Sequence, residues 1–555
     1  MQNSEPLPAR DQPAISKARP IRHRISEKTA ILVALFGICL VAVAILYRPW
    51  NTPAIGLDSA ASVLYFDRLV SHQTLEAFVG STPKPFMTLL DGLAFNVFHD
   101  WRLLSIVATI EFPVMLAAGA ALAWRTSGPV AAGMAAFGLI GTQLLLLDGA
   151  LTYATPWAIL FWVLAGLALT GSSPRYGLAG IALFLAMLMR IETLTILAVA
   201  TVALGAWRFL PTRWTPDGSR PPARAILLVF GFVALPVMIL HDWLLTSNGL
   251  FWLDVSSIVS RADPASVATP AQLGRDLAQH YLAVWPLVVL AGVAVFDLVR
   301  RRRAVVLLGL IACGPGVLAL LELLALRSTY VSYRYTIPAD AALVLAAAIG
   351  ADALVRSLAA VARRGRTLPN AMARLVAGER FRDRLAVAAA AVAIGAIISV
   401  ALVRPYGLSH GTLTTIDGYR ALQANYERLL PTIAGAARAL PDQPIWTVAD
   451  NQHYDAGPPP RLYVPPLLNV RIAIDLGLPI WAVRSGSPLR GDPSTLRVAV
   501  PAIVYIDVRQ GGNPPGEDQP LEVDRVTRVG HVIVEPLVAL PSEGLWVVQL
   551  NPTGD

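Results

Sequence analysis

Cysteine and charge are both scarce in this sequence of 555 residues. The two cysteines, Cys39 and Cys313, stand inside apolar runs, where a thiol packs as a small hydrophobic group. A disulfide framework in the regions between these runs is therefore excluded. Charged residues make up 15% of the chain, against roughly 25% in average soluble domains. With 55% hydrophobic residues and a mean hydropathy of +0.56, most of the chain is predicted to lie in lipid.

Several site signatures are also missing from the sequence. There is no glycine-rich loop of the kind that holds nucleotide phosphates, and the loop after Gly56 has no Asp-x-Asp pair. His280 has no second histidine or paired carboxylate at ligand spacing, so no metal site is predicted, and the need for a divalent ion stays open. The net charge of +8 comes from short basic loops without interleaved aromatic residues. It indicates membrane orientation and argues against nucleic-acid binding.

Long apolar runs dominate the chain. A membrane span needs about 20 apolar residues, and eleven runs are candidates: 29–47, 103–124, 129–147, 152–170, 175–189, 191–209, 225–245, 282–298, 304–326, 336–355 and 385–403. A further run, 85–98, is shorter and is interrupted by Asp91 and Asn96. It is predicted to lie along the membrane surface. The predicted fold class is a polytopic α-helical membrane protein with about 11 transmembrane helices and an interfacial helix in the first outer loop.

Basic residues set the predicted orientation. They gather in four segments, 1–28, 208–224, 300–303 and 356–384. All four fall on the cytoplasmic side if 85–98 does not cross the membrane. The first span follows a basic segment too long for a signal peptide, so it is predicted to be retained. The prediction is a cytoplasmic tail over 1–28, a membrane domain over 29–403 with an outer loop over 48–102, and an extracytoplasmic domain over 404–555. Richness in Ala, Arg and Leu fits a bacterial inner membrane protein.

The C-terminal region is about the size of one soluble domain. Strand-like runs occur at 445–449, 497–508 and 545–550, and helix-like runs at 419–440 and 467–476. Turns rich in proline and glycine separate these runs. A small soluble α/β domain is therefore predicted.

Two acids at the outer ends of predicted spans are candidates for chemistry. Asp58 follows Gly56-Leu57 and begins a helix-spaced apolar run in the first outer loop. It could cap that helix, or it could act as a general base that takes a proton from a hydroxyl. Asp148 ends a run of four leucines before a tight turn. It could be a surface residue, or a second carboxylate that orients donor or acceptor. Asp67 is predicted to be solvated.

Cations on the same predicted face could bind phosphate. Arg334 has Tyr333 and Tyr335 as neighbours. Its planar guanidinium can hold phosphate oxygens in two places, although tyrosines are also ordinary residues of the membrane interface. Lys84 lies between two prolines that stiffen the backbone. It could add a second positive charge, or it could extend to the interface as many lysines do.

Arg190 and Glu192 interrupt an apolar stretch. They could be an ion-paired turn between two spans, or a lipid-phosphate site in which Glu192 holds the arginine.

In their order along the chain, these features resemble the integral-membrane glycosyltransferases of the GT-C family, over roughly residues 29 to 400. The matching features are the early Asp58, Lys84-Pro85-Phe86 before an interfacial helix, Asp148 at the end of the third span, and Arg334-Tyr335-Thr336-Ile337-Pro338. Relatives often have a second proline where this chain has Phe86.

The resemblance implies a transferase that uses a polyprenyl-phosphate sugar as donor at the outer membrane face. It implies an acceptor that is a glycan, lipid or protein. Proton abstraction by Asp58 from the face of the sugar opposite the phosphate would predict inversion at the anomeric carbon. The resemblance further implies that Asp58 is the catalytic base and Asp148 a supporting acid. Arg334, Lys84, Arg190 and Tyr335 would lie near the donor phosphate, with Glu192 and Tyr333 in support.

Two other functions stay open on the sequence. Glu111, His241 and Glu322 lie in or near spans, as they do in transporters and lipid flippases. A scaffold that presents the outer domain is the third possibility. The polar residues gather at one membrane face and the two halves do not resemble each other, and both facts favour the transferase.

Overall fold

The computed structural model describes residues 27–75, 79, 81–209, 222–254, 269–326, 333–364, 412–439, 462–464, 468–478, 483–485, 502–507, 525–540, 542 and 545–553. The α-helices are α1 (Glu27–Tyr47), α2 (Leu57–Val70), α3 (Pro85–Phe98), α4 (Arg102–Thr126), α5 (Pro129–Ile140), α6 (Gln143–Ala150), α7 (Ala154–Leu169), α8 (Tyr176–Met189), α9 (Thr193–Phe209), α10 (Ala234–Thr246), α12 (Pro270–Ala283), α13 (Trp285–Arg300), α14 (Ala304–Ile311), α15 (Val317–Leu326), α16 (Ile337–Arg364), α19 (Thr412–Ala439) and α20 (Asn469–Leu476). Two 3₁₀ segments, η3 (Ala223–Val233) and η5 (Tyr333–Thr336), and one π turn, η4 (Ala312–Gly316), join them.

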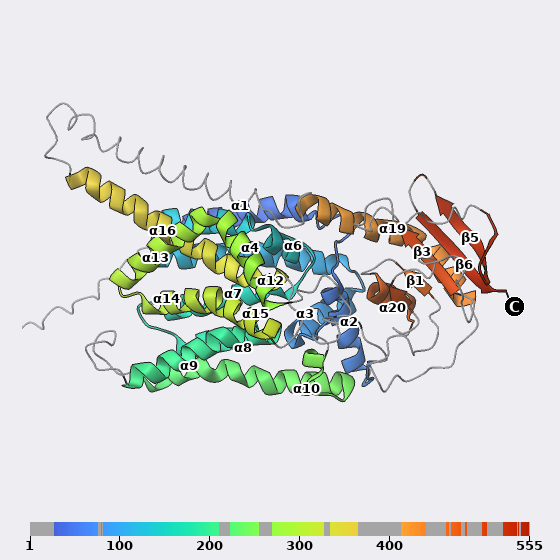
Figure 1. The fold of residues 1–555 in the computed structure, drawn as a ribbon, viewed down its shortest axis with the longest axis horizontal. Helices are drawn as coiled ribbons and strands as arrows, with labels where there is room; N and C mark the ends of the chain where they lie inside the picture. Colours follow the sequence, from blue (N-terminus) through green and yellow to red (C-terminus); the bar gives the residue numbers. More distant parts are fainter. Residues whose placement is uncertain are drawn as a thin grey trace, which may run out of the picture.

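The helical bundle carries the predicted spans. Five helices in the described residues are long and apolar enough to cross a membrane, and two further pairs qualify if each bent pair is one span. The shorter apolar helices α3, α7, α8 and α9 accompany them. Figure 1 shows the bundle at one end of the molecule, with the small sheet at the other end. A polytopic helical protein is therefore confirmed, while eleven crossings stay a prediction, and 385–403 lies outside the described residues.

One run predicted as a continuous span is bent, and another begins at a bend. The run 129–147 forms α5 and α6, which meet at 65°. Helix α5 ends at Ile140, Gly141 is its C-cap, and Thr142 is extended. The run 282–298 corresponds to α13 apart from its first residues, which end α12, and the two helices meet at 84°. Pro286, at the start of α13, has no N–H to continue the preceding helix.

The C-terminal region combines a sheet with two helices. The strands are β1 (Leu462–Val464), β2 (Val483–Ser485), β3 (Ala502–Asp507), β4 (Thr527–Val529), β5 (Val532–Leu540) and β6 (Leu545–Pro552). Their order is β2-β1-β3-β6-β5-β4, with β1 parallel to β2 and β3, and the other pairs antiparallel. The predicted helices appear as α19 and α20, and two predicted strands as β3 and β6. The predicted strand 445–449 lies outside the described residues.

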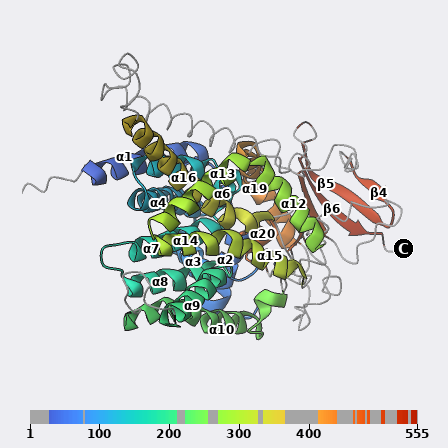
Figure 2. The ribbon, with the colours of Figure 1, turned by 60° about the vertical axis from the view of Figure 1, so that its left-hand side comes forward.

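The first outer loop and the C-terminal region share one hydrophobic core. Tyr65 of α2, Phe95 of α3, Tyr426 of α19, Ile472 of α20 and Val547 of β6 are buried in the same cluster. Figure 1 shows α2, α3 and α20 between the bundle and the sheet, and Figure 2 shows α19 and α20 there from another direction. Because α2 carries Asp58, the C-terminal region helps to hold the part of the chain on which the predicted base lies.

Candidate active site

The start of α2 is fixed against the turn between α6 and α7. Gly56 precedes the helix, and its N–H donates to the carbonyl of Leu151 at 3.1 Å. A Cβ on Gly56 would lie 2.7 Å from the Tyr153 ring and 2.9 Å from the Leu151 oxygen, so a side chain there would collide with both. One turn further, the Ser59 hydroxyl donates to the carbonyl of Thr152 at 2.6 Å. The position of Asp58 between these two contacts is therefore well defined.

The Asp58 carboxylate is bound by side chains, not by the helix N-terminus. Its Oδ1 accepts from the Ser81 hydroxyl at 2.9 Å, and its Oδ2 accepts from Lys84 Nζ at 3.1 Å and from Arg334 Nη2 at 3.4 Å. Burial raises the pKa of this carboxyl, but the Lys84 ammonium and the Arg334 guanidinium outweigh burial and hold the pKa well below its usual range. The helix-cap interpretation of Asp58 is wrong, because the N-cap residue is Gly56 and no side chain caps α2.

Lys84 lies at the N-terminus of α3, directly before Pro85 in the first helical turn. Proline fits this position because its missing N–H would have no helical partner there. The Lys84 ammonium donates to Asp58 and, at 3.2 Å, to the carbonyl of Thr82. Burial lowers the pKa of Lys84, and the nearby Arg190 and Arg334 lower it further against the opposing effect of Asp58. Three cations therefore lie close enough to influence one another.

Arg334 joins the two predicted acids. It belongs to η5, directly before α16. Its Nε donates to Asp148 Oδ1 at 3.2 Å, while its Nη2 contacts Asp58. Its guanidinium carbon lies 3.8 Å from the centre of the Tyr153 ring, a cation–π contact that fixes the plane of the fork. The Arg334 side chain thus connects η5 with α2 and α6.

A second set of contacts lies behind Asp148. The Thr155 hydroxyl donates to Asp148 Oδ2 at 2.6 Å and accepts from Arg190 Nη1 at 3.1 Å. Arg190 in turn holds Glu192 through two nitrogens, with Nε 3.1 Å from one carboxylate oxygen and Nη2 bonded to the other. The Arg190 guanidinium also lies 5.0 Å from the centre of the Tyr335 ring. A continuous polar network therefore runs from Ser81 to Glu192.

Exposure divides this network into two layers. The side chains of Asp58, Lys84 and Arg334 are 16%, 12% and 34% exposed. Those of Asp148, Arg190 and Glu192 are 2%, 4% and 4% exposed. A ligand can reach the first three directly. Of the inner three, Asp148 bonds Arg334 directly, and Arg190 and Glu192 add charge behind it.

The structure brings most of the predicted site residues together. Asp58, Lys84, Asp148, Arg190, Glu192, Arg334 and Tyr335 are all members of the network or in contact with it. The side chain of Tyr333 lies outside the described part of the chain. Asp67 pairs with the adjacent Arg68 and is 52% exposed, in agreement with its prediction as a solvated residue.

Sequence reasoning missed three members of the site. Ser81 and Thr155 bind the two carboxylates, and Tyr153 lies under Arg334. Tyr153 and Thr155 follow Asp148 within seven residues, where one predicted span ends and the next begins. This nearness to Asp148 in the sequence could have identified them as candidates. A single serine in a long loop gives no such signal.

Two of the residues that had suggested a transporter, Glu111 and His241, form no hydrogen bond or ion pair with this network in the described part of the chain. Glu111 is buried in α4, and its Oε1 has no partner among the described residues. His241 Nδ1 lies 3.3 Å from Asp242 in α10. Within the described ranges, no three His, Cys, Asp or Glu side chains form a group that could hold a metal ion.

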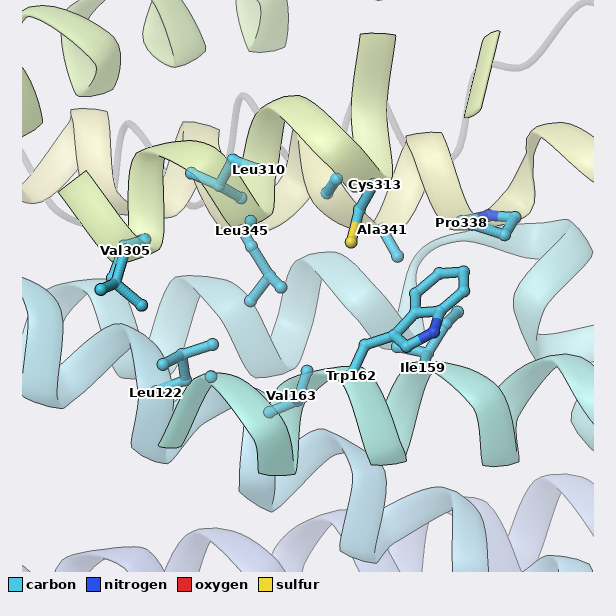
Figure 3. A pocket seen from close by; sticks show the side chains of 14 residues that line it. Leu122, Ile159, Trp162, Val163, Val305, Leu310, Cys313, Pro338, Ala341 and Leu345 are labelled. Atoms are coloured by element: carbon cyan, nitrogen blue, oxygen red, sulfur yellow. The ribbon is translucent and has the colours of Figure 1, made fainter. Parts of the chain in front are cut away.

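An apolar cavity of about 80 Å³ lies among α4, α7, α14, η4 and α16. Figure 3 shows the labelled side chains around it, with Trp162 on one side and Cys313 and Ala341 opposite. Pro338, which lines the cavity, stands four residues after Arg334. The Trp162 indole donates at 3.0 Å to the hydroxyl of Thr193, the residue that follows Glu192. The cavity therefore shares α7, which carries Thr155, with the polar network.

Comparison of the sequence with protein-family models and with curated proteins gave no match. Comparison of the structure with solved structures gave ArnT from Cupriavidus metallidurans bound to undecaprenyl phosphate, at 12% sequence identity and a TM-score of 0.49, covering 94% of this chain and 98% of that chain. It also gave the archaeal oligosaccharyltransferase AglB from Archaeoglobus fulgidus in complex with an inhibitory peptide and a dolichol-phosphate, at 13% identity and a TM-score of 0.45, covering 81% of this chain and 64% of that chain. The similarity to both structures extends over most of this chain.

Proposed function

We propose that this protein is a membrane glycosyltransferase that moves a sugar from a polyprenyl-phosphate donor to an acceptor outside the cytoplasm. The observation that carries this proposal is the position of the Asp58 carboxylate between Lys84 and Arg334, at 3.1 and 3.4 Å. A reachable base beside two reachable cations matches the needs of transfer from a sugar phosphate. The reaction needs a group that accepts the hydroxyl proton, and cations that stabilise the departing phosphate.

In the proposed reaction, the donor phosphate lies against Lys84 and Arg334. The acceptor oxygen attacks the anomeric carbon from the face opposite the phosphate and gives its proton to Asp58. The bond from the anomeric carbon to the phosphate oxygen breaks, and the electron pair leaves with the polyprenyl phosphate. A single attack of this kind inverts the anomeric carbon.

The contacts of Asp58 suggest how donor binding prepares the base. Lys84 and Arg334 hold the pKa of Asp58 low in the free protein, against the effect of burial, and a carboxylate with a low pKa is a weak base. A donor phosphate competes for the same two cations. When it takes them, the pKa of Asp58 rises and the carboxylate becomes a better proton acceptor, at the moment when the donor is in place.

The inner layer has a supporting role in this proposal. Asp148 receives Arg334 Nε at 3.2 Å and so fixes the direction of the guanidinium. Arg190 is held by Glu192 and Thr155 and adds positive potential near the phosphate. The apolar cavity beside Pro338 is the proposed place for the part of the isoprenoid chain nearest to the phosphate, since its lining carries almost no polar surface.

A reconstituted transport and transfer assay tests the proposal. Proteoliposomes containing the protein receive a polyprenyl-phosphate sugar that is radiolabelled in the sugar, together with a mixture of membrane glycan, lipid and peptide acceptors. We expect label to appear in an acceptor, with release of polyprenyl phosphate. Movement of intact donor between leaflets without product would favour the flippase instead. If a preparation that binds the donor shows no product and no movement of the donor, the result would favour the scaffold.

A further inference from the structure

Helix α19 connects the C-terminal region to residues 48–56, the segment that leads into α2 and the proposed base Asp58. Figure 1 shows it running from the end of α1 toward the sheet. It packs against α6 on one side and against β3 and β6 on the other. Between α1 and α2, residues 48–56 contain no helix or strand. The position of this segment, and with it the start of α2, depends on what holds its ends.

Arg420 of α19 holds the first end of the segment. The last carbonyls of α1 have no partner within the helix, and the chain turns away at Arg48, whose φ is 42°. Arg420 Nη2 donates to the carbonyl of Leu46 at 3.0 Å and also to that of Tyr47. Its Nη1 pairs with Asp417 at 2.7 Å. A buried guanidinium at a helix C-terminus satisfies free carbonyls and interacts favourably with the helix dipole.

Gln423, one turn later on α19, holds the second end. Its Nε2 donates to the carbonyl of Ile55 at 3.4 Å, three residues before Asp58. Its Oε1 accepts from Arg471 Nη1 of α20. Gln423 and Ile55 are each 1% exposed, so water does not compete for this bond.

The residues behind Gln423 form a rigid support. Arg471 pairs with Glu427 at 2.6 Å, and its guanidinium lies 5.5 Å from the ring centre of Trp101. Asp475 of α20 accepts from the Trp101 indole at 2.8 Å and from Tyr426 at 3.1 Å. The support for Gln423 therefore comes from α19, α20 and the start of α4 together.

We infer that the C-terminal region positions the proposed base, through Arg420 and Gln423 of α19, which hold both ends of the segment that leads into Asp58. Arg420 and Gln423 are positioning residues, because neither is bonded to the Asp58 carboxylate. This inference rests on the proposed function for its catalytic consequence, but the mechanical claim stands on the contacts alone. Misplacement of a reacting group by about 1 Å can cost about 100-fold in rate, so loss of either contact should lower turnover.

The test uses the full-length protein in nanodiscs. Arg420→Met and Gln423→Ala remove the two contacts, and Arg420→Lys keeps a positive charge that can still reach the carbonyls. Arg438→Met is the matched control, because Arg438 is an exposed arginine on the same helix. Transfer per folded molecule, the KM for donor, and hydrogen–deuterium exchange over residues 54–62 are measured for each variant.

We expect Arg420→Met and Gln423→Ala to lower kcat by about 10- to 100-fold with less than a twofold change in donor KM. We expect Arg420→Lys to recover part of the loss. Exchange over residues 54–62 should become faster in the two damaging variants and stay unchanged in Arg438→Met. Normal kcat and normal exchange in both variants would overturn the inference. If the wild-type protein transfers no sugar, the exchange measurement still tests the positioning claim, while the proposed function fails separately.

Discussion

Arg334 Nη2 lies 3.4 Å from Asp58 Oδ2, although the two residues are 276 positions apart in the chain. The same guanidinium reaches Asp148 through Nε at 3.2 Å. Arg334 is therefore shared between a partly exposed acid, Asp58, and a buried one, Asp148. A ligand phosphate that binds Arg334 must compete with Asp58, while the bond to Asp148 can stay in place and keep the guanidinium aligned.

Replacement of Arg334 tests its proposed contact with the donor. Arg334→Ala should weaken binding of a polyprenyl-phosphate donor by about 10- to 100-fold, because a hydrogen bond to a charged group contributes about 1.5–3 kcal/mol. Arg334→Lys should recover part of the affinity, since the charge remains but the second contact is lost. Equilibrium binding of a fluorescent polyprenyl phosphate in nanodiscs measures the effect.

Arg102→Ala is the control for this series, because Arg102 is an exposed arginine at the start of α4 and should leave donor affinity unchanged. Donor affinity in Arg334→Ala equal to that of the wild type would remove Arg334 from the donor site. Size-exclusion profiles identify any variant that has lost its fold.

Thr155 is the bridge between Asp148 and Arg190, so its hydroxyl should support both stability and activity. Thr155→Val keeps the shape of the side chain but removes the hydroxyl that bonds two buried atoms of charged groups, Asp148 Oδ2 and Arg190 Nη1. Thermal and denaturant unfolding should show a loss of about 1–3 kcal/mol, and Thr155→Ser should restore most of it. Thr201→Val removes a bond within one helix and should cost less. An equal loss in both valine variants would contradict the bridging role.

The pH dependence of turnover tests whether donor binding releases Asp58. In the free protein the pKa of Asp58 is held below its usual value of roughly 3.9, so the carboxylate stays ionised as the pH falls toward that value. When the donor phosphate binds Lys84 and Arg334, these cations no longer lower the pKa of Asp58. The Asp58 carboxylate is then protonated at a higher pH than in the free protein. A sugar phosphodiester does not titrate in this range.

The acid limb of kcat should therefore lie at higher pH than the acid limb of kcat/KM for the donor, because kcat reports the complex and kcat/KM reports the free protein. Initial rates between the lowest pH that keeps the protein folded and neutral pH measure both limbs. If the acid limbs of kcat and kcat/KM lie at the same pH, donor binding leaves the pKa of Asp58 unchanged, which would contradict the prediction.

The sequence could predict the site because its members lie at the ends of spans. The count of spans and basic loops placed Asp58, Asp148 and Arg334 on one membrane face. Side chains at the same end of one helical bundle lie close to one another. Ser81 was not predictable, because a single serine in a loop carries no pattern. The partners within the network depend on which helices pack together, and hydropathy does not contain that information.

The bends and the shared core also lay beyond the sequence patterns. Gly141 and Thr142 sit inside an apolar run, so hydropathy continues across the bend between α5 and α6. The packing of α2 against α20 joins segments about 400 residues apart and leaves no trace in local periodicity. The predicted domain boundary at 404 gave no indication that the C-terminal region contacts the segment that leads into Asp58.

The comparison of Asp58→Asn with Asp67→Asn tests the central claim most directly. Both substitutions replace a carboxylate by an amide on α2, but Asp58 lies in the polar network and Asp67 is exposed. Transfer of radiolabelled sugar from a polyprenyl-phosphate donor is measured with purified, folded protein. We predict that Asp58→Asn lowers kcat by about 10²- to 10⁴-fold while Asp67→Asn transfers sugar at the wild-type rate. Turnover by Asp58→Asn close to that of the wild type would contradict the role of Asp58 as the base.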